Sequence, residues 1–190
     1  MSQGWVHAIL KLGGSSSSSL GSIRKYIDQK TTQSLVHAYV TSRLDYCNSL
    51  LHGLPNHLLE RLQRVQNTAA RMITRTRKYD HITPVLKNLH WLPIEERIEY
   101  KIILITFKAL NNQAPKYISE LLIPYKPVRT LRSESQCRLT VSRTKSKLGN
   151  RCFQNSAPVL WNDLPLDLKK ITELNTFKSQ LKTHLFNKAY

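Results

Sequence analysis

The chain has 190 residues, of which 41% are hydrophobic and 22% are charged, and these fractions are typical of a folded globular protein. They exclude a collagen-like, fibrous or wholly disordered chain. Lysine and arginine together number 29 against 12 aspartates and glutamates, so the net charge is +17. A surplus of this size favours a polyanionic partner, and the alternative is a basic surface that only keeps the protein in solution.

Residues 1–22 differ in composition from the rest of the chain. Gly13 and Gly14 are followed by five serines, a sequence typical of a flexible linker. We expect this segment to be disordered or unrelated to the region that follows. Residues 23–112 then carry helical patterns, and residues 113–190 form a basic region with terminal helices. The expected fold is therefore mainly α, a helical bundle with a small basic hairpin or loop and C-terminal helices.

A first helix is predicted from about Thr31. Five apolar residues recur at spacings that place them on one helical face: Val36, Val40, Leu44, Cys47 and Leu51. Gly53 is expected to end this helix, and Pro55 to open the next.

The next helix, about Asn56 to Thr76, carries two distinct faces. An apolar seam repeats at spacings of four and three residues, and consists of Leu58, Leu62, Val65, Ala69 and Met72. Five cations fall within an arc of roughly 100° away from that seam, if each residue turns the helix by about 100°. These cations are Arg61, Arg64, Arg71, Arg75 and Lys78, called the basic ridge below. Only Glu60 balances them nearby, which favours a phosphate-binding surface over an ordinary solvated face.

The region after this helix is expected to build the core. Residues 79–84 read as a turn, and residues 86–92 as a short helix that includes Trp91. Pro93 then opens a strongly apolar helix, which Asn111 and Asn112 should end. The core stripe of that helix is Ile94, Ile98, Ile102, Ile105 and Ala109, widened by Ile103, Leu104, Phe107 and Leu110.

Residues 126–151 are the second basic region, with eight cations and one acidic residue, Glu134. Alternation of apolar and polar residues over 137–142 predicts a short strand, and a hairpin is one arrangement for it. Such a segment can bind a nucleic-acid backbone, and a disordered basic linker is the open alternative. The candidate contacts, called the basic arm below, are Arg138, Arg143, Lys145 and Lys147.

Two further helices are predicted towards the C-terminus. Phe153, Ala157, Leu160 and Trp161 fit a short buried helix that ends at Leu164 and Pro165. A terminal amphipathic helix follows, with Leu174, Phe177, Leu181 and Leu185 inward and with Lys178 and Lys182 outward.

The sequence carries no motif for catalysis or metal binding. Its five aspartates are scattered, whereas two-metal polymerase and nuclease sites need carboxylates placed close together. It also has no Gly-rich phosphate loop, no zinc-ligand spacing among its seven histidines and no G-x-S-x-G elbow. We therefore expect a non-enzyme with no catalytic residue, no bound metal and no cofactor.

Three scattered cysteines, Cys47, Cys137 and Cys152, form no C-x-x-C pair. They predict a reducing compartment, in the nucleus or cytoplasm, in which the cysteines act mainly as small core residues. The longest apolar runs are far shorter than a membrane span, and no basic segment precedes the first of them. Neither a membrane partner nor a secretory signal is expected.

Several ordered strings of the sequence closely resemble the reverse transcriptases of LINE (non-LTR) retrotransposons, of the Jockey or chicken-repeat kind. The resemblance runs from about residue 23 to the end of the chain. The strings are LVHAYVTSRLDYCNSLL at 35–51, LQRVQNTAAR at 62–71, TRTRKYDHITP at 74–84, LHWLP at 89–93, TFKAL at 106–110, APVLWNDLP at 157–165 and FKSQLKTHLF at 177–186.

In that family these stretches follow the polymerase palm, in the thumb-like helices and the C-terminal region. The resemblance implies a part that contacts template RNA and primer DNA during target-primed reverse transcription. The family's Tyr/Phe-x-Asp-Asp motif has no match here, so no catalytic residue carries over. Residues 1–22 do not resemble a palm, which indicates the tail of a truncated or decayed element.

The leading hypothesis is a non-catalytic fragment of a retrotransposon RNA-directed DNA polymerase with low-specificity affinity for RNA or DNA backbones. Tyr79 and Trp91 are candidates for base stacking, with core packing favoured for Trp91. A second hypothesis is a helical protein-interaction module, in which the apolar seam pairs with a missing polymerase palm domain or another partner. A third is a decayed element without any selected function.

Overall fold

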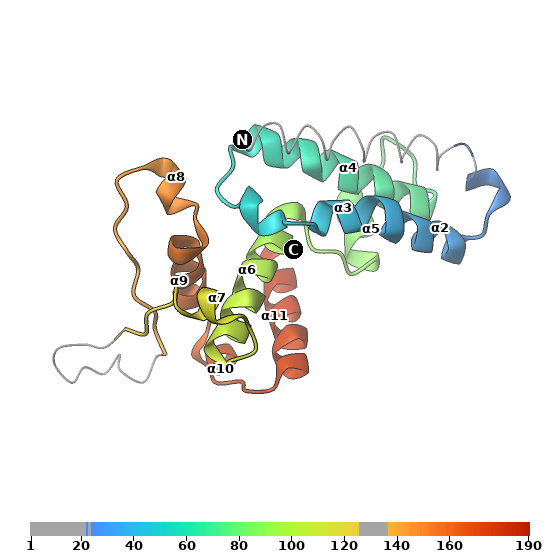
Figure 1. Ribbon diagram of the computed structural model, residues 1–190. Coiled ribbons are helices and arrows are strands. Elements are labelled where there is room, and N and C mark those ends of the chain that lie inside the picture. Colours follow the sequence, from blue (N-terminus) through green and yellow to red (C-terminus); the bar gives the residue numbers. More distant parts are fainter. Residues whose placement is uncertain (1–21, 23, 126–136) are drawn as a thin grey trace. The chain divides into compact units, whose positions relative to one another are not determined.

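The structure is a computed structural model that describes residue 22, residues 24–125 and residues 137–190 (Figure 1). Within these residues the regular structure is helical, and no strand element occurs. The expectation of a mainly α fold is confirmed. The expected disorder of residues 1–22 falls almost wholly outside the described residues, as do Lys126, Arg129 and Arg132 of the second basic region.

The chain divides into two compact units. Unit 1 contains the residues up to Arg97 together with Lys188–Tyr190, and unit 2 contains Ile98–Asn187. The division falls within helix α6 (Ile94–Leu110). The boundary expected from composition, near residue 112, instead lies inside unit 2.

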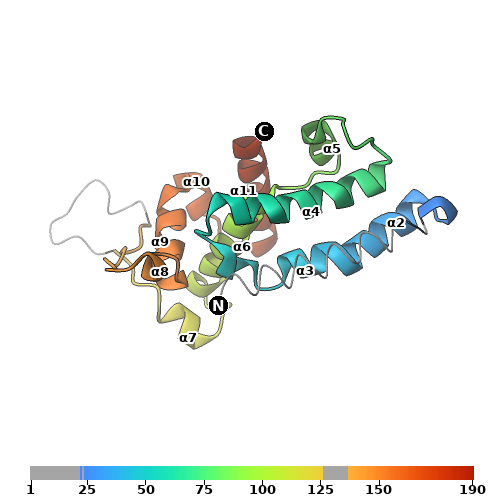
Figure 2. The same cartoon turned by 90° about the horizontal axis from the view of Figure 1, so that it is seen from above.

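Unit 1 is built around helix α4, which lies alongside α2 and α3 in both views (Figures 1 and 2). Asp28 begins α2 because its carboxylate accepts a hydrogen bond from the Thr31 amide. Hydrogen bonding to the Thr31 side chain, and then to its amide, lowers the pKa of Asp28. The elements in chain order are the 3-10 turn η1 (Arg24–Tyr26), α2 (Gln29–Val36), the π-helical turn η2 (His37–Thr41), α3 (Ser42–Asp45), the 3-10 turn η3 (Asn48–Leu51), α4 (Asn56–Thr74) and α5 (Ile82–Asn88).

The first predicted helix is shorter than its apolar spacing suggested. Val36, Val40 and Leu44 are buried as expected, but α3 ends at Asp45 and Cys47 adopts a left-handed conformation with φ of 52°. The chain direction changes there, so Cys47 no longer shares a face with the earlier residues. Cys47, Cys137 and Cys152 are all exposed, and the prediction that the cysteines are core residues is wrong.

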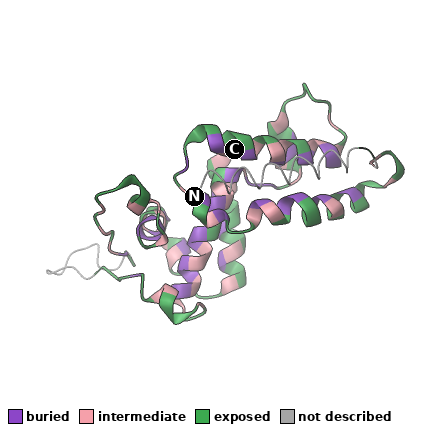
Figure 3. Cartoon of the chain, turned by 45° about the horizontal axis from the view of Figure 1, so that its top comes forward, coloured by how far each residue is buried: buried purple, intermediate pink, exposed green. Residues whose placement is uncertain are grey.

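The predicted seam of α4 is largely buried, and it is part of a wider face. Leu58, Leu62, Ala69 and Met72 are at most 6% exposed, whereas Val65 is half-buried. The buried face extends to Gln66, Ala70 and Ile73 because α4 packs against both α2 and α5. The chain itself therefore covers this seam, which removes it as an open docking surface for a partner helix. Figure 3 shows buried and exposed residues alternating along these helices.

The short helix after α4 begins earlier than predicted. α5 starts at Ile82, and Pro84 is accommodated in its first turn, where a missing N–H removes no helical hydrogen bond. Trp91 follows the helix instead of belonging to it, and it is 7% exposed. Its ring lies 5.8 Å from that of His37. Trp91 is a core residue, and so it is not a platform for base stacking.

Unit 2 contains the remainder of α6, which ends at Leu110 with Asn112 left-handed, as Asn111 and Asn112 predicted. The core centres on Phe107 and Phe177, whose rings stack at 4.0 Å, with Trp161 at 6.1 Å from Phe177. The other helices are α7 (Lys116–Ser119), α8 (Lys147–Asn150), α9 (Phe153–Asp163), α10 (Leu166–Lys169) and α11 (Leu174–Ala189), so both predicted C-terminal helices are present.

The strand predicted over residues 137–142 does not form. Leu139 makes one isolated antiparallel bridge with Pro124, flanked by hydrogen bonds from Tyr125 to Arg138 and from Thr140 to Ile123. In this antiparallel pair the flanking residues make the hydrogen bonds, so the amide and carbonyl of Leu139 point away from Pro124. The amide and carbonyl of Leu139 instead bond to the side chain of Asn162. The alternating residues 137–142 therefore form an irregular segment, which the side chain of Asn162 holds at Leu139.

Candidate nucleic-acid interface

The basic ridge of α4 faces away from the buried side of that helix. Arg61 and Arg64 are exposed, whereas Leu62 and Ile73 are buried. A turn of about 100° per residue places Arg64 roughly opposite these two buried residues and Arg61 at the side of the helix, about 100–120° from them. Helical geometry thus separates the cations from the core, as the sequence predicted. A phosphate chain can approach this face without disturbing the packing of unit 1.

Part of the ridge lines an open pocket of about 610 Å³, called the basic pocket below. Its cations come from three parts of unit 1: η1, α4 and the turn after α4. Its lining includes no aspartate or glutamate. The lining residues are Arg24, Arg64, Asn67, Thr68, Arg71, Met72, Thr76 and Lys78. Four cations around a concave surface, with amide and hydroxyl groups between them, can bind one or two phosphate groups.

Arg71 also shapes this pocket. Its Nε donates a hydrogen bond to the Arg77 carbonyl at 3.2 Å, and its Nη2 donates to the Asp80 carbonyl at 2.9 Å. The Asp80 carboxylate in turn accepts from the Arg77 amide at 3.0 Å. These bonds hold the 77–80 turn against the end of α4, so Lys78 is displayed on a braced turn.

The remaining ridge cations lie outside the lining of the pocket. Arg75 ends α4 in a left-handed conformation with φ of 58°, and its Nη2 donates to the Ile27 carbonyl at 3.5 Å. Arg61 is exposed one turn before Arg64. The structure therefore brings Arg64, Arg71 and Lys78 together in the pocket, and it adds Arg24, which the sequence analysis missed.

The basic arm belongs to unit 2 and is organised differently. Arg138, Arg143, Lys145 and Lys147 are all exposed. Only Lys147 lies in a helix, the single turn α8, which Ser146 begins by accepting a hydrogen bond from the Gly149 amide. The arm cations are displayed along an extended stretch of chain, and none of them lines the basic pocket.

One end of the basic arm is fastened to α9. Asn162 accepts a hydrogen bond from the Leu139 amide at 2.9 Å and donates one to the Leu139 carbonyl at 2.8 Å. The Trp161 indole donates to the Cys137 carbonyl at 2.9 Å. Lys169 donates to the Asn162 carbonyl at 2.8 Å, and burial followed by the charge of Arg138 lowers the pKa of this lysine.

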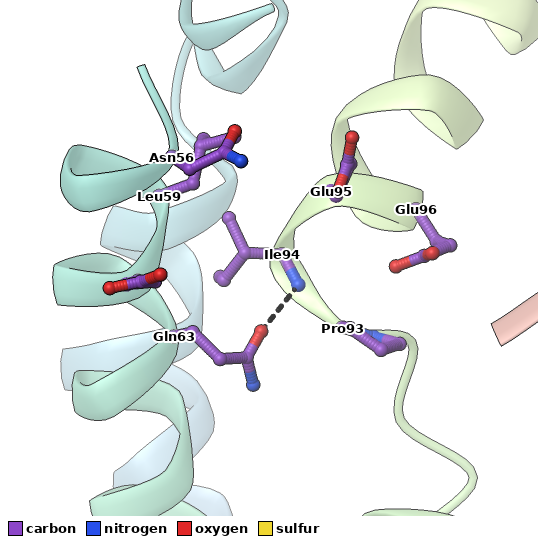
Figure 4. A pocket seen from close by; sticks show the side chains of 8 residues that line it. Asn56, Leu59, Gln63, Pro93, Ile94, Glu95 and Glu96 are labelled. Atoms are coloured by element: carbon purple, nitrogen blue, oxygen red, sulfur yellow. Dashed lines mark hydrogen bonds between the residues drawn. The ribbon is translucent and has the colours of Figure 1, made fainter. Parts of the chain in front are cut away.

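A second pocket beside α4, of about 350 Å³, has the opposite charge (Figure 4). It is lined by Glu60, Glu95 and Glu96 with neighbouring residues of α4 and the start of α6. Gln63, one of the lining residues, accepts a hydrogen bond from the Ile94 amide at 2.8 Å, the dashed line in Figure 4. Cations therefore gather on one side of α4 and carboxylates near its contact with α6.

The amide side chains of α4 fasten the segment that leads into α6. Gln66 is 1% exposed and donates to the Leu92 carbonyl at 2.8 Å. Gln63 donates to Gln66 at 3.0 Å and to Asn67 at 2.8 Å. Gln63 and Gln66 of the LQRVQNTAAR string are thus structural, since they bond to the backbone of Ile94 and Leu92 and so hold the segment that contains the LHWLP string.

Two other polar pairs within unit 1 are also structural. The Arg97 guanidinium binds both carboxylate oxygens of Asp45, at 2.6 and 2.7 Å from Nη2. The Tyr190 hydroxyl donates to the Trp91 carbonyl at 2.9 Å. Burial, and then the charge of Glu96, raise the pKa of Tyr190 to about 12.

Within the described residues, no group of three histidine, cysteine, aspartate or glutamate side chains is arranged to hold a metal ion. No described helix is long and apolar enough to cross a membrane. No family model, curated protein or solved structure matches this chain. The resemblance to LINE reverse transcriptases therefore stays a prediction from the sequence strings.

Proposed function

We propose that this chain is a non-catalytic part of a LINE-type RNA-directed DNA polymerase that binds RNA or DNA backbones. The observation that carries the proposal is the basic pocket, in which Arg24, Arg64, Arg71 and Lys78 line one concavity without a carboxylate. Cations that a fold gathers in this way repel one another, and phosphate groups relieve that repulsion. Backbone contacts position a nucleic acid and carry little sequence information, so binding should be largely independent of sequence.

The basic arm supplies a second set of backbone contacts in this proposal. Its four cations are exposed, and one end of the segment is fastened by Trp161 and Asn162. The resemblance supports the same conclusion, because the matching regions of the family follow the palm and contact template and primer. The sequence strings contain no catalytic aspartate pair, so we propose no polymerase or nuclease activity for these residues.

The test is fluorescence anisotropy of a labelled RNA hairpin and a labelled DNA duplex, titrated with the full chain at several salt concentrations. We expect micromolar binding. On B-DNA, the logarithm of the association constant should fall by about 0.9 per logarithmic unit of salt concentration for each phosphate neutralised. Arg64→Gln should make that slope shallower by about the amount expected for one lost phosphate contact. The matched control is Lys182→Gln, which removes the same charge from the exposed side of α11 in unit 2. Absence of binding at low salt by a chain with a helical circular-dichroism spectrum would refute the proposal.

A protein-interaction module remains the second candidate, on a different surface from the one the sequence indicated. The α4 seam is covered, but unit 2 exposes several large apolar side chains, three of them within two residues of the bridge between Pro124 and Leu139 and one in α8. The most exposed are Leu148 at 73% and Ile123 at 53%, followed by Tyr125 and Val141. Loss of self-association or palm binding in Ile123→Ser, together with no effect of Arg64→Gln, would favour this function over nucleic-acid binding.

A further inference from the structure

Two tyrosines beside the basic pocket are almost completely exposed. Tyr79 is 92% exposed and Tyr26 is 87% exposed, the highest values among the large hydrophobic side chains described. Each follows closely on a cation of the pocket: Lys78 precedes Tyr79, and Arg24 begins the η1 turn that Tyr26 ends. Neither ring contributes to the core of unit 1, and each presents aromatic faces to solvent next to phosphate-binding groups.

The position of Tyr79 is fixed by the turn that carries it. Arg71 donates hydrogen bonds to the carbonyls of Arg77 and Asp80, on either side of Lys78 and Tyr79. The Asp80 carboxylate closes the same turn through the Arg77 amide. A stacking partner therefore meets a ring on a preorganised backbone, which lowers the conformational entropy lost on binding.

The η1 turn is linked to the same end of α4. Arg75 Nη2 donates to the carbonyl of Ile27, the residue after Tyr26, at 3.5 Å. Arg24, from this turn, lines the same pocket as Arg64 and Lys78. The two tyrosines thus lie in the two segments that contribute Arg24 and Lys78 to the lining of the basic pocket.

We propose that unit 1 binds single-stranded RNA or DNA in preference to duplex, with backbone phosphates in the basic pocket and unpaired bases stacked on Tyr79 and Tyr26. This inference rests on the proposed function and narrows its substrate class. Stacking on an aromatic side chain requires an unpaired base, because in a duplex the base faces are covered by their neighbours. A charged pocket flanked by aromatic rings is the combination that sequence-tolerant single-strand binders use. A surface built for duplex needs only the cations.

The test measures the affinity of the full chain for a labelled 12-nucleotide single strand, for the duplex of the same sequence, and for an abasic strand of the same length. We expect the single strand to bind about tenfold more tightly than the abasic strand, which has the same phosphates without bases. Tyr79→Ala should remove most of that advantage and leave duplex affinity unchanged, while Tyr79→Trp should retain it. Tyr117→Ala, a substitution of a 68% exposed tyrosine in unit 2, is the matched control.

The outcomes separate this inference from the function on which it rests. Equal affinity for the single strand and the abasic strand, or single-strand affinity unchanged in the Tyr26→Ala Tyr79→Ala double variant, would overturn stacking and leave backbone binding in place. Binding to none of the three probes by a folded chain would overturn both. Tighter binding to duplex than to single strand would also overturn the preference proposed here.

Discussion

The basic pocket and the basic arm carry similar charge on very different supports. In the pocket, cations from η1, α4 and the 77–80 turn line one concavity, and Arg71 fixes the turn by two backbone hydrogen bonds. In the arm, Arg143 and Lys145 lie on an irregular segment that is fastened at one end by Asn162. A count of charges cannot distinguish these two surfaces. We therefore propose that the supporting hydrogen bonds determine whether such cations act together on one phosphate or separately along a strand.

The largest expected effect comes from reversing charge on the two surfaces separately. Arg64→Glu with Lys78→Glu should weaken binding of a single strand about 10- to 100-fold at low salt, because two pocket cations then repel phosphate. The same number of reversals in the arm, Arg143→Glu with Lys145→Glu, should weaken it by a few-fold only. Anisotropy titrations of the two double variants, which carry equal net charge, make the measurement. Equal losses of affinity in the two double variants would show that the concave shape of the pocket adds nothing to strand binding.

A smaller effect is expected from releasing the arm. Asn162→Ala removes two hydrogen bonds to the Leu139 backbone and should lower the free energy of unfolding of unit 2 by about 1–2 kcal/mol. Hydrogen exchange at the Leu139 amide should accelerate, while exchange at the buried end of α4 should not change. Asn162→Asp is the graded control, because aspartate keeps the acceptor and loses the donor. Unaltered exchange at Leu139 in Asn162→Ala would contradict the role assigned to this side chain.

The smallest effect concerns pH and unit 1. The pKa of Tyr190 is raised from 10.0 to about 12, so the folded chain holds this proton more tightly than the unfolded chain. The resulting stabilisation is complete below pH 10 and is lost as the pH rises from 10 towards 12. Tyr190→Phe should therefore be less stable than the original chain at pH 9, and the difference should shrink by pH 12. Urea unfolding at both pH values measures this, and a constant difference would exclude the linkage.

The helical elements could be predicted where apolar spacing was sustained. α4, α6, α9 and α11 were expected from periodicity, and the separation of Arg64 from the core followed from helix geometry alone. Predictions failed where a local feature interrupted the period. The left-handed Cys47 ended one helix, and Asn162 took the backbone groups of Leu139 that a strand would have used.

The candidate site was only partly visible in the sequence for a similar reason. Arg64, Arg71 and Lys78 share a helix face or follow it directly, so spacing could group them. Arg24 joins them from a turn 40 residues before Arg64, and no local pattern encodes that approach. The hydrogen bonds by which Arg71 holds the 77–80 turn could not be predicted either. Helical periodicity shows on which face of a helix a side chain lies, and it does not show which backbone carbonyls that side chain contacts.

The fastening of unit 1 by Gln63, Gln66 and Asn67 has one more consequence. These three side chains are electrically neutral, so salt has little effect on their hydrogen bonds to one another and to the Leu92–Ile94 backbone. Phosphate contacts at the exposed cations are, in contrast, weakened steeply by salt. Under the function proposed above, a rise in ionic strength should therefore release a bound strand while the fold of unit 1 is preserved.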